Sequence, residues 1–475
     1  MSAFAWRPVT AVASVVTALL LATANRYDYH RDELYFRILG RHPQWGYVDQ
    51  PPFTPLLTRL STLILGDSLW AIRVPSALMI GAMAFLTALI AREAGGGRAA
   101  QTLAACAVFG AFPLVGGHVV TTATPDLLVW LGVLFFVLRA LLHDRPRAWL
   151  AAGAITGLGL YNKHLVLLLL VSLVAGILVL GPRRVLVTRW PWLGAALALV
   201  IGLPNLLYQV ANHFPQADMA AAIAENKGTE SRIELLPFQL ILLGLFFVPI
   251  WIAGIVALLR DPALRPARSL AVAYPILLVL VLVTAGQPYY PMGLVTGLFA
   301  IGAVRASRWR VRWPLVAVNA AVSALFALPL LPVDRLGPIA EINSTVADQI
   351  GWREYVREIA GVYATLTPPE RQRAVLFTSN YGEAGALDRY GPALGLPAAY
   401  SGHNELHHYG PPPESRTVAV VVSGTPPAAF GSCDFGTRLH NSAGVDNEEL
   451  DASVFVCRHL PATWADMWPA LQHYD

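Results

Sequence analysis

Long apolar runs recur along this chain up to about residue 333. A helix needs about 17–25 predominantly apolar residues to cross a bilayer, and these runs have about that length. We predict membrane spans over residues 8–24, 68–91, 99–115, 125–142, 148–162, 164–181, 191–209, 237–259, 269–286, 289–304 and 313–333. The sequence therefore predicts a polytopic α-helical membrane protein with about 11 transmembrane helices.

The charge content excludes an ordinary cytosolic enzyme. Only 13% of the 475 residues are charged, whereas soluble domains carry about 25%. The net charge of +4 does not indicate a nucleic-acid partner, because the arginines stand in short clusters between apolar runs. Such clusters are typical of loops that set the orientation of membrane helices.

The arginines gather in alternate loops between the predicted spans, and the positive-inside rule places those loops in the cytoplasm. They are Arg7, Arg92, Arg98, Arg145, Arg147, Arg183, Arg184, Arg189, Arg260, Arg265, Arg268, Arg305, Arg308, Arg310 and Arg312. The N-terminus is then cytoplasmic. With an odd number of spans, residues 334–475 are extracytoplasmic, and residues 1–333 form the transmembrane domain.

The C-terminal segment, 334–475, is polar, and prolines and glycines interrupt it at many positions. Helical periodicity over 352–366 and β-like runs at 374–378, 417–422 and 453–456 predict a small α/β domain on the outer face.

Two of the three cysteines, Cys433 and Cys457, fall in this outer domain, while Cys106 falls in a predicted span. An oxidising compartment permits pairing, so we predict a disulfide between Cys433 and Cys457. It would tie a Gly-Ser turn to a β-strand. Two independent thiols are the alternative.

The first outer loop, residues 25–67, is dense in carboxylates and aromatic residues. We predict a short interfacial helix over 32–39, with Asp32 and Glu33 in its first turn, and an amphipathic helix over 53–65. Long loops of this composition commonly carry function. A solvated loop with ordinary surface charges is the alternative.

Further charged residues lie at the outer ends of predicted spans: Arg73, Asp126 and Lys163. A charge at membrane depth is costly unless it is paired or faces a polar cavity. The alternatives are a helix N-terminal carboxylate for Asp126 and snorkelling to the interface for Lys163. Tyr289 and Tyr290 follow Gln287 in another outer turn, where aromatic residues also serve as interfacial anchors.

This set of residues suits sugar transfer from a lipid phosphate. A hydroxyl acceptor needs a base near it in the transition state, and a departing phosphate needs positive charge or hydrogen-bond donors. A lipid or sugar transporter or flippase, or a receptor-like binding module, is the competing interpretation. A transporter would place charges deep in several spans, whereas most of these lie at the outer edge.

The membrane part resembles the dolichyl-phosphate-mannose–protein mannosyltransferase-like family, which includes the lipid A aminoarabinose transferases and belongs to the C-type glycosyltransferase superfamily. The resemblance covers the whole membrane part and rests on the order and common outer-face placement of several motifs. They are Asp32-Glu33, the segment 45–52, Thr124-Pro125-Asp126, Tyr161-Asn162-Lys163-His164, Pro204-Asn205 with Asn212-His213, and Gln287-Pro288-Tyr289-Tyr290.

The resemblance implies a polyprenyl-phosphate-linked sugar as donor and transfer with inversion at the outer face of a bacterial plasma membrane. The acceptor is a cell-envelope glycan, lipid or protein. The resemblance assigns Asp32 as catalytic base, followed by Glu33, with Asp126 shaping the acceptor site. No metal is obligatory, although a divalent ion held by these carboxylates is an open alternative.

We expect the remaining site residues in two groups. The donor-phosphate group is Lys163, Arg73, Gln287, Tyr289, Tyr290 and Gln50, and the acceptor-side group is His30, Tyr47, Asp49 and His403. Some family members have a lysine where Gln50 and Gln287 stand here, so phosphate binding rests more on Lys163, Arg73 and the tyrosines. The histidines in loop 401–408 also have a spacing that suits zinc; we expect a polar loop that caps the acceptor side.

Overall fold

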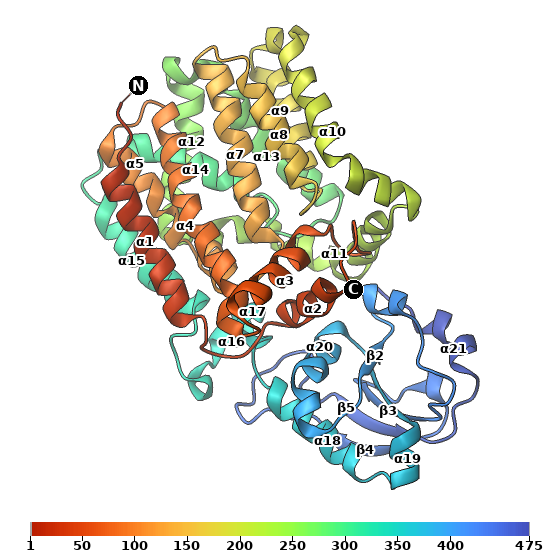
Figure 1. Ribbon diagram of the computed structural model, residues 1–475. Coiled ribbons are helices and arrows are strands. Elements are labelled where there is room, and N and C mark those ends of the chain that lie inside the picture. Colours follow the sequence, from red (N-terminus) through yellow and green to blue (C-terminus); the bar gives the residue numbers. More distant parts are fainter. Residues whose placement is uncertain (1, 475) are drawn as a thin grey trace.

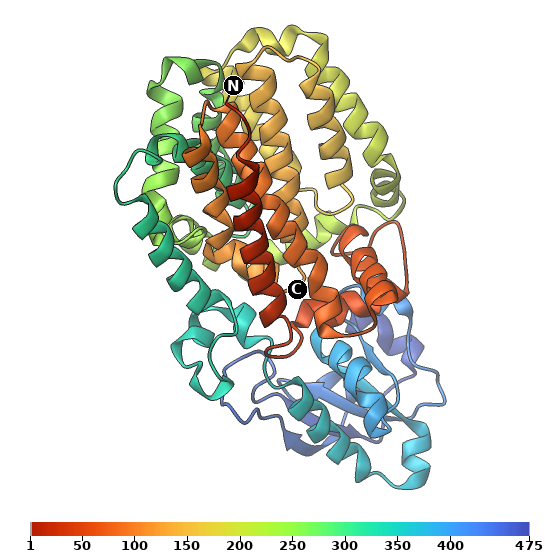
Figure 2. The same cartoon turned by 60° about the vertical axis from the view of Figure 1, so that its left-hand side comes forward.

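The computed structural model describes residues 2–474, which form a helical bundle with a small sheet at one end (Figures 1 and 2). The described residues contain four helices long and apolar enough to cross a membrane, or up to six if each of two bent pairs is one span. The four are α1 (Trp6–Thr23), α4 (Leu69–Glu93), α7 (Ala123–Leu142) and α10 (Arg189–Ala211).

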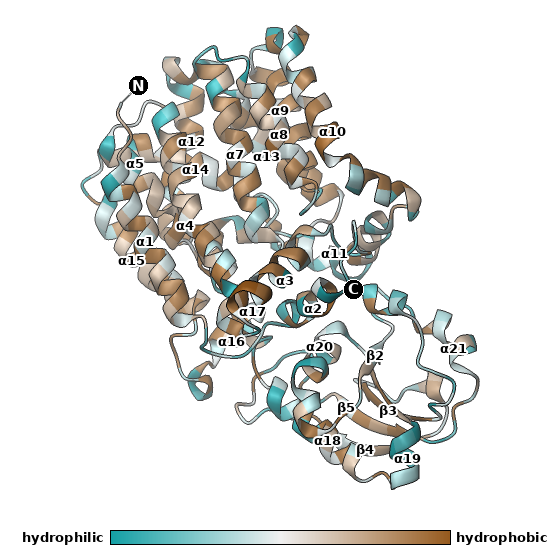
Figure 3. Ribbon diagram, viewed as in Figure 1, coloured by the Kyte–Doolittle hydropathy of each residue, from teal (hydrophilic) through white to brown (hydrophobic). Residues whose placement is uncertain are grey.

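The bent pairs are α5 (Arg98–Ala105) and η1 (Cys106–Phe109) with α6 (Ala111–His118), bent by 58°, and α11 (Pro215–Ile241) with η3 (Leu245–Phe247) and α12 (Val248–Arg260), bent by 68°. Shorter apolar helices complete the bundle: α8 (Ala148–Gly159), α9 (Val166–Leu180), α13 (Ser269–Val283), α14 (Met292–Ala306) and α15 (Arg312–Ala327). Every predicted span falls on one of these helices or bent pairs, and apolar residues dominate the bundle (Figure 3).

The two bends meet at one buried side chain. Asn319 of α15 is 1% exposed and donates hydrogen bonds to the backbone oxygens of Phe109 (3.3 Å) and Leu243 (2.8 Å). A broken helix frees backbone groups that must be satisfied inside the protein. Gly244 has φ +96°, and a Cβ there would lie 2.3 Å from the Asn319 Oδ1 atom, so the close approach requires glycine.

The first outer loop folds as two helices, α2 (Arg31–Arg41) and α3 (Phe53–Leu65), which lie between the bundle and the sheet (Figure 1). The bounds of α3 are those predicted from its amphipathic pattern. It leaves apolar side chains such as Leu63 and Ile64 more than 60% exposed (65% and 69%). An exposed apolar stripe of this kind is typical of a helix that lies in a membrane interface.

The C-terminal unit, residues 352–474, contains a mixed five-stranded sheet in the order β2-β1-β3-β5-β4. Its strands are β1 (Ala374–Thr378), β2 (Ala399–Ser401), β3 (Val418–Ser423), β4 (Cys433–Arg438) and β5 (Ser453–Cys457). β1 pairs in parallel with β2 and β3, and β5 is antiparallel to β3 and β4. Apolar side chains of β1 alternate between two cores. One core includes α18 (Trp352–Ala364) and α20 (Tyr381–Tyr390), and the other α21 (Trp464–Leu471).

The structure contains a disulfide between Cys433 and Cys457, as the sequence predicts, but its setting differs. Cys433 begins strand β4 rather than a turn, and it faces Cys457 directly in the antiparallel pair of β4 with β5. Directly opposed residues of such a pair lie about 4.5–5.5 Å apart, and these Cα atoms are 4.2 Å apart. The bridge therefore joins the exposed edge strand to its buried neighbour.

Replacing both Cys433 and Cys457 by serine is expected to lower the free energy of unfolding of the C-terminal unit by about 3 kcal/mol. The reason is that the bridge closes a loop with a sequence separation of 24, which restricts the unfolded chain. Denaturant unfolding of the oxidised chain, the reduced chain and the double variant measures the difference. Equal stability in all three would contradict the prediction.

Candidate active site

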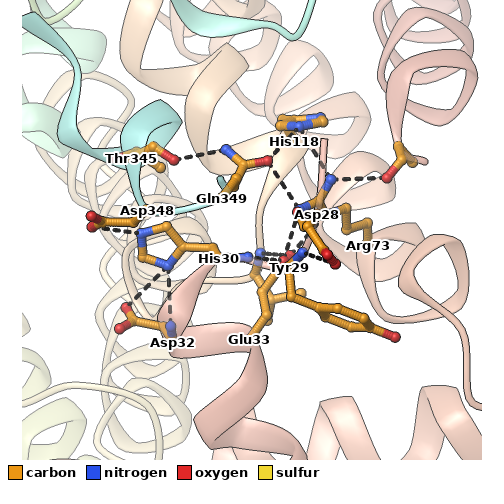
Figure 4. Close-up of polar contacts among 12 residues, drawn as sticks. Asp28, Tyr29, His30, Asp32, Glu33, Arg73, His118, Thr345, Asp348 and Gln349 are labelled. Atoms are coloured by element: carbon orange, nitrogen blue, oxygen red, sulfur yellow. Dashed lines mark hydrogen bonds and ion pairs between the residues drawn. The ribbon is translucent and has the colours of Figure 1, made fainter. Parts of the chain in front are cut away.

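The first turn of α2 presents two adjacent carboxylates in opposite environments (Figure 4). His30 caps the helix, because its side chain accepts a hydrogen bond from the Asp32 backbone while Glu33 accepts one from the His30 backbone. This reciprocal arrangement is a capping box. Asp32 keeps one third of its side chain exposed (33%), whereas Glu33 is fully buried (0%).

Glu33 and Arg73, which the sequence predicts as site residues, form a buried ion pair with each other. The Arg73 Nη2 and Nε atoms lie 2.8 and 2.9 Å from the two Glu33 carboxylate oxygens, and neither side chain is exposed. The pair is further satisfied by hydrogen bonds to backbone and side-chain groups. Arg73 donates to Ala24, Asp28 and Gln349, and Glu33 accepts from the Val120 backbone. Both residues therefore hold the first loop against α4 through a pair without solvent exposure.

Asp32 lies against the C-terminal unit through Tyr381, the first residue of α20. The Tyr381 hydroxyl donates to Asp32 Oδ1 at 2.9 Å. The tyrosine ring stacks on Tyr35 and His403, with centroids 4.6 and 4.9 Å away, and the Arg31 guanidinium covers it at 4.9 Å. These contacts fix the hydroxyl and, through it, the orientation of the carboxylate.

A second group of predicted residues comes together near Asp32. Lys163 Nζ donates to the Tyr289 hydroxyl at 3.1 Å and lies over the rings of Tyr289 and Tyr290, 5.2 and 5.4 Å from their centroids. Asp32 and Asp126 both lie close enough to Tyr289 for their charges to act on its hydroxyl. One Asp126 carboxylate oxygen is buried and makes no hydrogen bond with residues 2–474. The arrangement places a cation and a hydroxyl group within electrostatic reach of two carboxylates.

Three other predicted residues have structural roles. Tyr47 is fully buried and its hydroxyl donates to the backbone oxygens of Leu39 and His42, and buried His30 caps α2. His403 is 2% exposed and stacks between Tyr381 and His473. Burial and the neighbouring charges of His473 and Arg31 lower the pKa of His403 to about 2, which keeps it neutral. The structure gives each of these residues a structural contact, and their acceptor-side roles stay predictions.

The remaining predicted site residues are Gln50, Gln287 and Asp49. Gln50 is 5% exposed and Gln287 is half-buried. Burial and the neighbouring carboxylate of Glu405 raise the pKa of Asp49 to about 7. The acceptor-side role of Asp49 stays a prediction, for a carboxyl group whose pKa lies near neutral pH.

Sequence reasoning missed Tyr381, which supplies the hydrogen bond to Asp32. A local signal for its helix exists, because Asn380 and Glu383 form a capping box around the start of α20. The contact with Asp32, however, spans 349 positions along the chain. No pattern near either residue indicates that pairing.

The zinc alternative for loop 401–408 lacks the required geometry. His407 hydrogen-bonds the Trp468 backbone and stacks on the Trp468 ring, whereas His403 packs against Tyr381. Among residues 2–474 no group of three or more His, Cys, Asp or Glu side chains is placed to hold a metal ion.

A buried acidic cluster lies behind Tyr381 and gives the fold a pH dependence. Glu449 is 1% exposed, and burial raises its pKa to about 8, with neighbouring Arg31 opposing and Glu383 adding to the shift. The pKa of Glu383 is raised to about 7, again chiefly by burial. The folded state therefore favours both carboxyls in their neutral form.

We expect stability to fall as the pH rises from the usual glutamate value of 4.5 through about 8, because unfolding then lets Glu449 ionise. Below 4.5 the contribution of Glu449 is fully present. Glu449→Gln should flatten this fall, and exposed Glu341→Gln is the matched control. Thermal unfolding across this pH range tests the expectation, and parallel curves for both variants would contradict it.

Comparisons with known proteins find similarity in sequence and in fold. Residues 49–208 match the family described as dolichyl-phosphate-mannose-protein mannosyltransferase. Over 179 residues the chain is 27% identical to undecaprenyl phosphate-alpha-4-amino-4-deoxy-L-arabinose arabinosyl transferase 1 of Pseudomonas fluorescens (strain Pf0-1). That match covers 36% of this chain and 31% of the relative, so it spans about a third of the relative's length.

Crystal structures of ArnT from Cupriavidus metallidurans resemble the chain over much more of its length. The apo structure gives a TM-score of 0.61 at 17% identity, and the structure bound to undecaprenyl phosphate gives 0.58 at 18%. Each comparison covers 94% of this chain and 97% of the ArnT chain. The predicted resemblance is thus confirmed: the chain has the C-type fold of the membrane glycosyltransferases, in the form seen in ArnT.

Proposed function

We propose that this chain transfers a sugar from a polyprenyl-phosphate donor to a hydroxyl acceptor of the cell envelope. In this proposal residues 1–333 are the catalytic membrane domain and residues 334–475 lie outside a bacterial plasma membrane, with the N-terminus in the cytoplasm. The observation that carries the proposal is Asp32, a partly exposed carboxylate that accepts a hydrogen bond from Tyr381 and whose charge acts on Tyr289, the partner of Lys163. The ArnT crystallised with undecaprenyl phosphate, which shares this fold, supports the donor class.

The proposed chemistry assigns each group one task. Asp32 accepts the proton of the acceptor hydroxyl as its oxygen attacks the anomeric carbon. The bond between that carbon and the phosphate oxygen breaks, and the configuration inverts. In this proposal Lys163 and the Tyr289 hydroxyl, which are hydrogen-bonded to each other, stabilise the negative charge that develops on the departing phosphate. Phosphate is a good leaving group, so no strong general acid is needed.

Incubating the purified chain with a panel of polyprenyl-phosphate sugars and hydroxyl acceptors tests the proposal. We expect release of polyprenyl phosphate together with a new glycosidic bond for at least one donor. The alternative, a flippase, would move the labelled lipid across a vesicle membrane without releasing phosphate. Lipid movement with no cleavage in any donor–acceptor pair would favour that alternative.

Tyr381→Phe is expected to lower the turnover number by about tenfold while leaving donor KM nearly unchanged. The variant keeps the stacked ring but removes a hydrogen bond to a carboxylate, and such bonds are worth about 1.5–3 kcal/mol. Tyr390→Phe is a matched control at the other end of α20, because its hydroxyl bonds Asp28 instead. If the two variants behaved alike, Tyr381 would have no positioning role.

A further inference from the structure

A cavity of about 630 Å³ opens where the end of α1, the start of α4 and the C-terminal unit meet. Its walls include Tyr27, Asp28, Ser68, Arg353, Arg357 and Arg389. Asp32, Tyr381, Lys163 and Tyr289 do not line it. The cavity is therefore separate from the candidate active site.

The carboxylates in the walls already have partners. Asp28 Oδ2 lies 3.2 Å from Arg353 Nε, and the Tyr390 hydroxyl donates to its other oxygen. Glu354 accepts hydrogen bonds from the Ser442 backbone and hydroxyl at 2.6 and 2.8 Å. Asp28 is therefore balanced by Arg353, whereas Glu354 has neutral hydrogen-bond partners and keeps its charge.

Two guanidinium groups in the walls remain without an acidic partner. Within residues 2–474, no carboxylate lies within 4.0 Å of Arg357 or Arg389. Arg357 Nε donates only to the Arg353 backbone oxygen, at 3.1 Å. Arg389 contacts the faces of Tyr29 and Tyr390, and its Nε is buried without a hydrogen bond. Unused donors on two guanidinium groups that line one cavity favour an anionic ligand.

The chemistry and the position of the cavity identify the class of anion. Guanidinium groups match the oxygens of a phosphate with paired hydrogen bonds, and several arginines commonly bind one phosphate. Ser68 caps α4, which begins at Leu69, and Asn25 follows α1, so the cavity opens at the ends of two helices long and apolar enough to cross a membrane. We propose that Arg357 and Arg389 bind a phosphate group in this cavity, either as a free anion or on a lipid headgroup.

The test uses the full chain in detergent and measures binding by calorimetry, without any sugar transfer. One arm titrates inorganic phosphate, and the other titrates dioctanoyl phosphatidic acid, with dioctanoyl phosphatidylcholine as the reference lipid. Binding in both arms identifies the phosphate group itself as the ligand. Binding of phosphatidic acid alone identifies a lipid headgroup as the source.

The double variant Arg357→Gln with Arg389→Gln is expected to weaken phosphate binding by about tenfold or more, because it removes two charged donors. Arg373→Gln, an exposed arginine of the same unit outside the cavity, should leave binding unchanged. Thermal unfolding checks that each variant folds. If the double variant does not fold, the single variant Arg357→Gln, at an exposed position, replaces it. No binding of either phosphate probe, or equal binding by the control and the cavity variants, would overturn the proposal.

Discussion

Replacing Asp32 by asparagine is expected to slow sugar transfer by about 10²–10⁴-fold, the usual cost of losing a positioned general base. Asparagine preserves the shape of the side chain and can still accept the hydrogen bond from Tyr381. Its amide cannot take the proton of the acceptor hydroxyl. Donor binding should survive, because the Lys163–Tyr289 group is untouched. Single-turnover transfer and equilibrium donor binding separate the two quantities.

Asp67→Asn is the matched control, since Asp67 is a half-exposed carboxylate of the same outer loop that pairs with Arg37. It should keep near-normal transfer. If Asp32→Asn retained normal transfer while binding donor, the assignment of the base would be wrong. If it abolished donor binding as well, Asp32 would act in binding rather than in proton transfer.

Arg73→Met is expected to destabilise the fold by about 3–5 kcal/mol, the usual cost of leaving a buried charge without its partner. Glu33 is fully buried, and Arg73 donates a side-chain hydrogen bond to each of its carboxylate oxygens. The network joins the start of α2 to α4, Asp28 and Gln349, as Figure 4 shows. The loss should therefore reach the loop that carries Asp32. Unfolding in detergent by heat or denaturant measures it.

A second variant distinguishes the unpaired charge from lost packing. Glu33→Gln added to Arg73→Met removes the buried charge, yet the glutamine oxygen can still accept a hydrogen bond from the His30 or Val120 backbone. The double variant should recover part of the lost stability. A double variant less stable than Arg73→Met would show that the charge of Glu33 is not the cause.

The local periodicity of the sequence predicts the elements that bury a regular apolar face. The helix over 53–65 and the strand over 374–378 have the predicted bounds. An apolar face marks where the helix begins and ends, and an apolar run does so for the strand. β4 was missed because it is an edge strand whose residues, Phe435 included, are mostly exposed, so its sequence carries no buried pattern. β2 was missed because it is only three residues long.

The candidate site could be predicted in part for a related reason. The exposure of Asp32 follows from its place just after a span, and Lys163, Tyr289 and Tyr290 each stand at a recognisable outer turn. The same signal also selected Glu33 and Arg73, which pair with each other, because a charged residue at a membrane edge is as well explained by a buried partner as by a substrate. Only the tertiary fold distinguishes the two, since the pair is 40 positions apart.

The hydrogen bonds of Asn319 carry a consequence for how the protein is made. Asn319 follows Leu243 by 76 positions and Phe109 by 210, so both freed carbonyls leave the ribosome well before the side chain that satisfies them. An unsatisfied carbonyl in the hydrocarbon region costs several kcal/mol. The two bent segments therefore reach their final form only once α15 has inserted. We therefore expect a nascent chain that stops short of α15 to lack these two hydrogen bonds, however completely its earlier helices have formed.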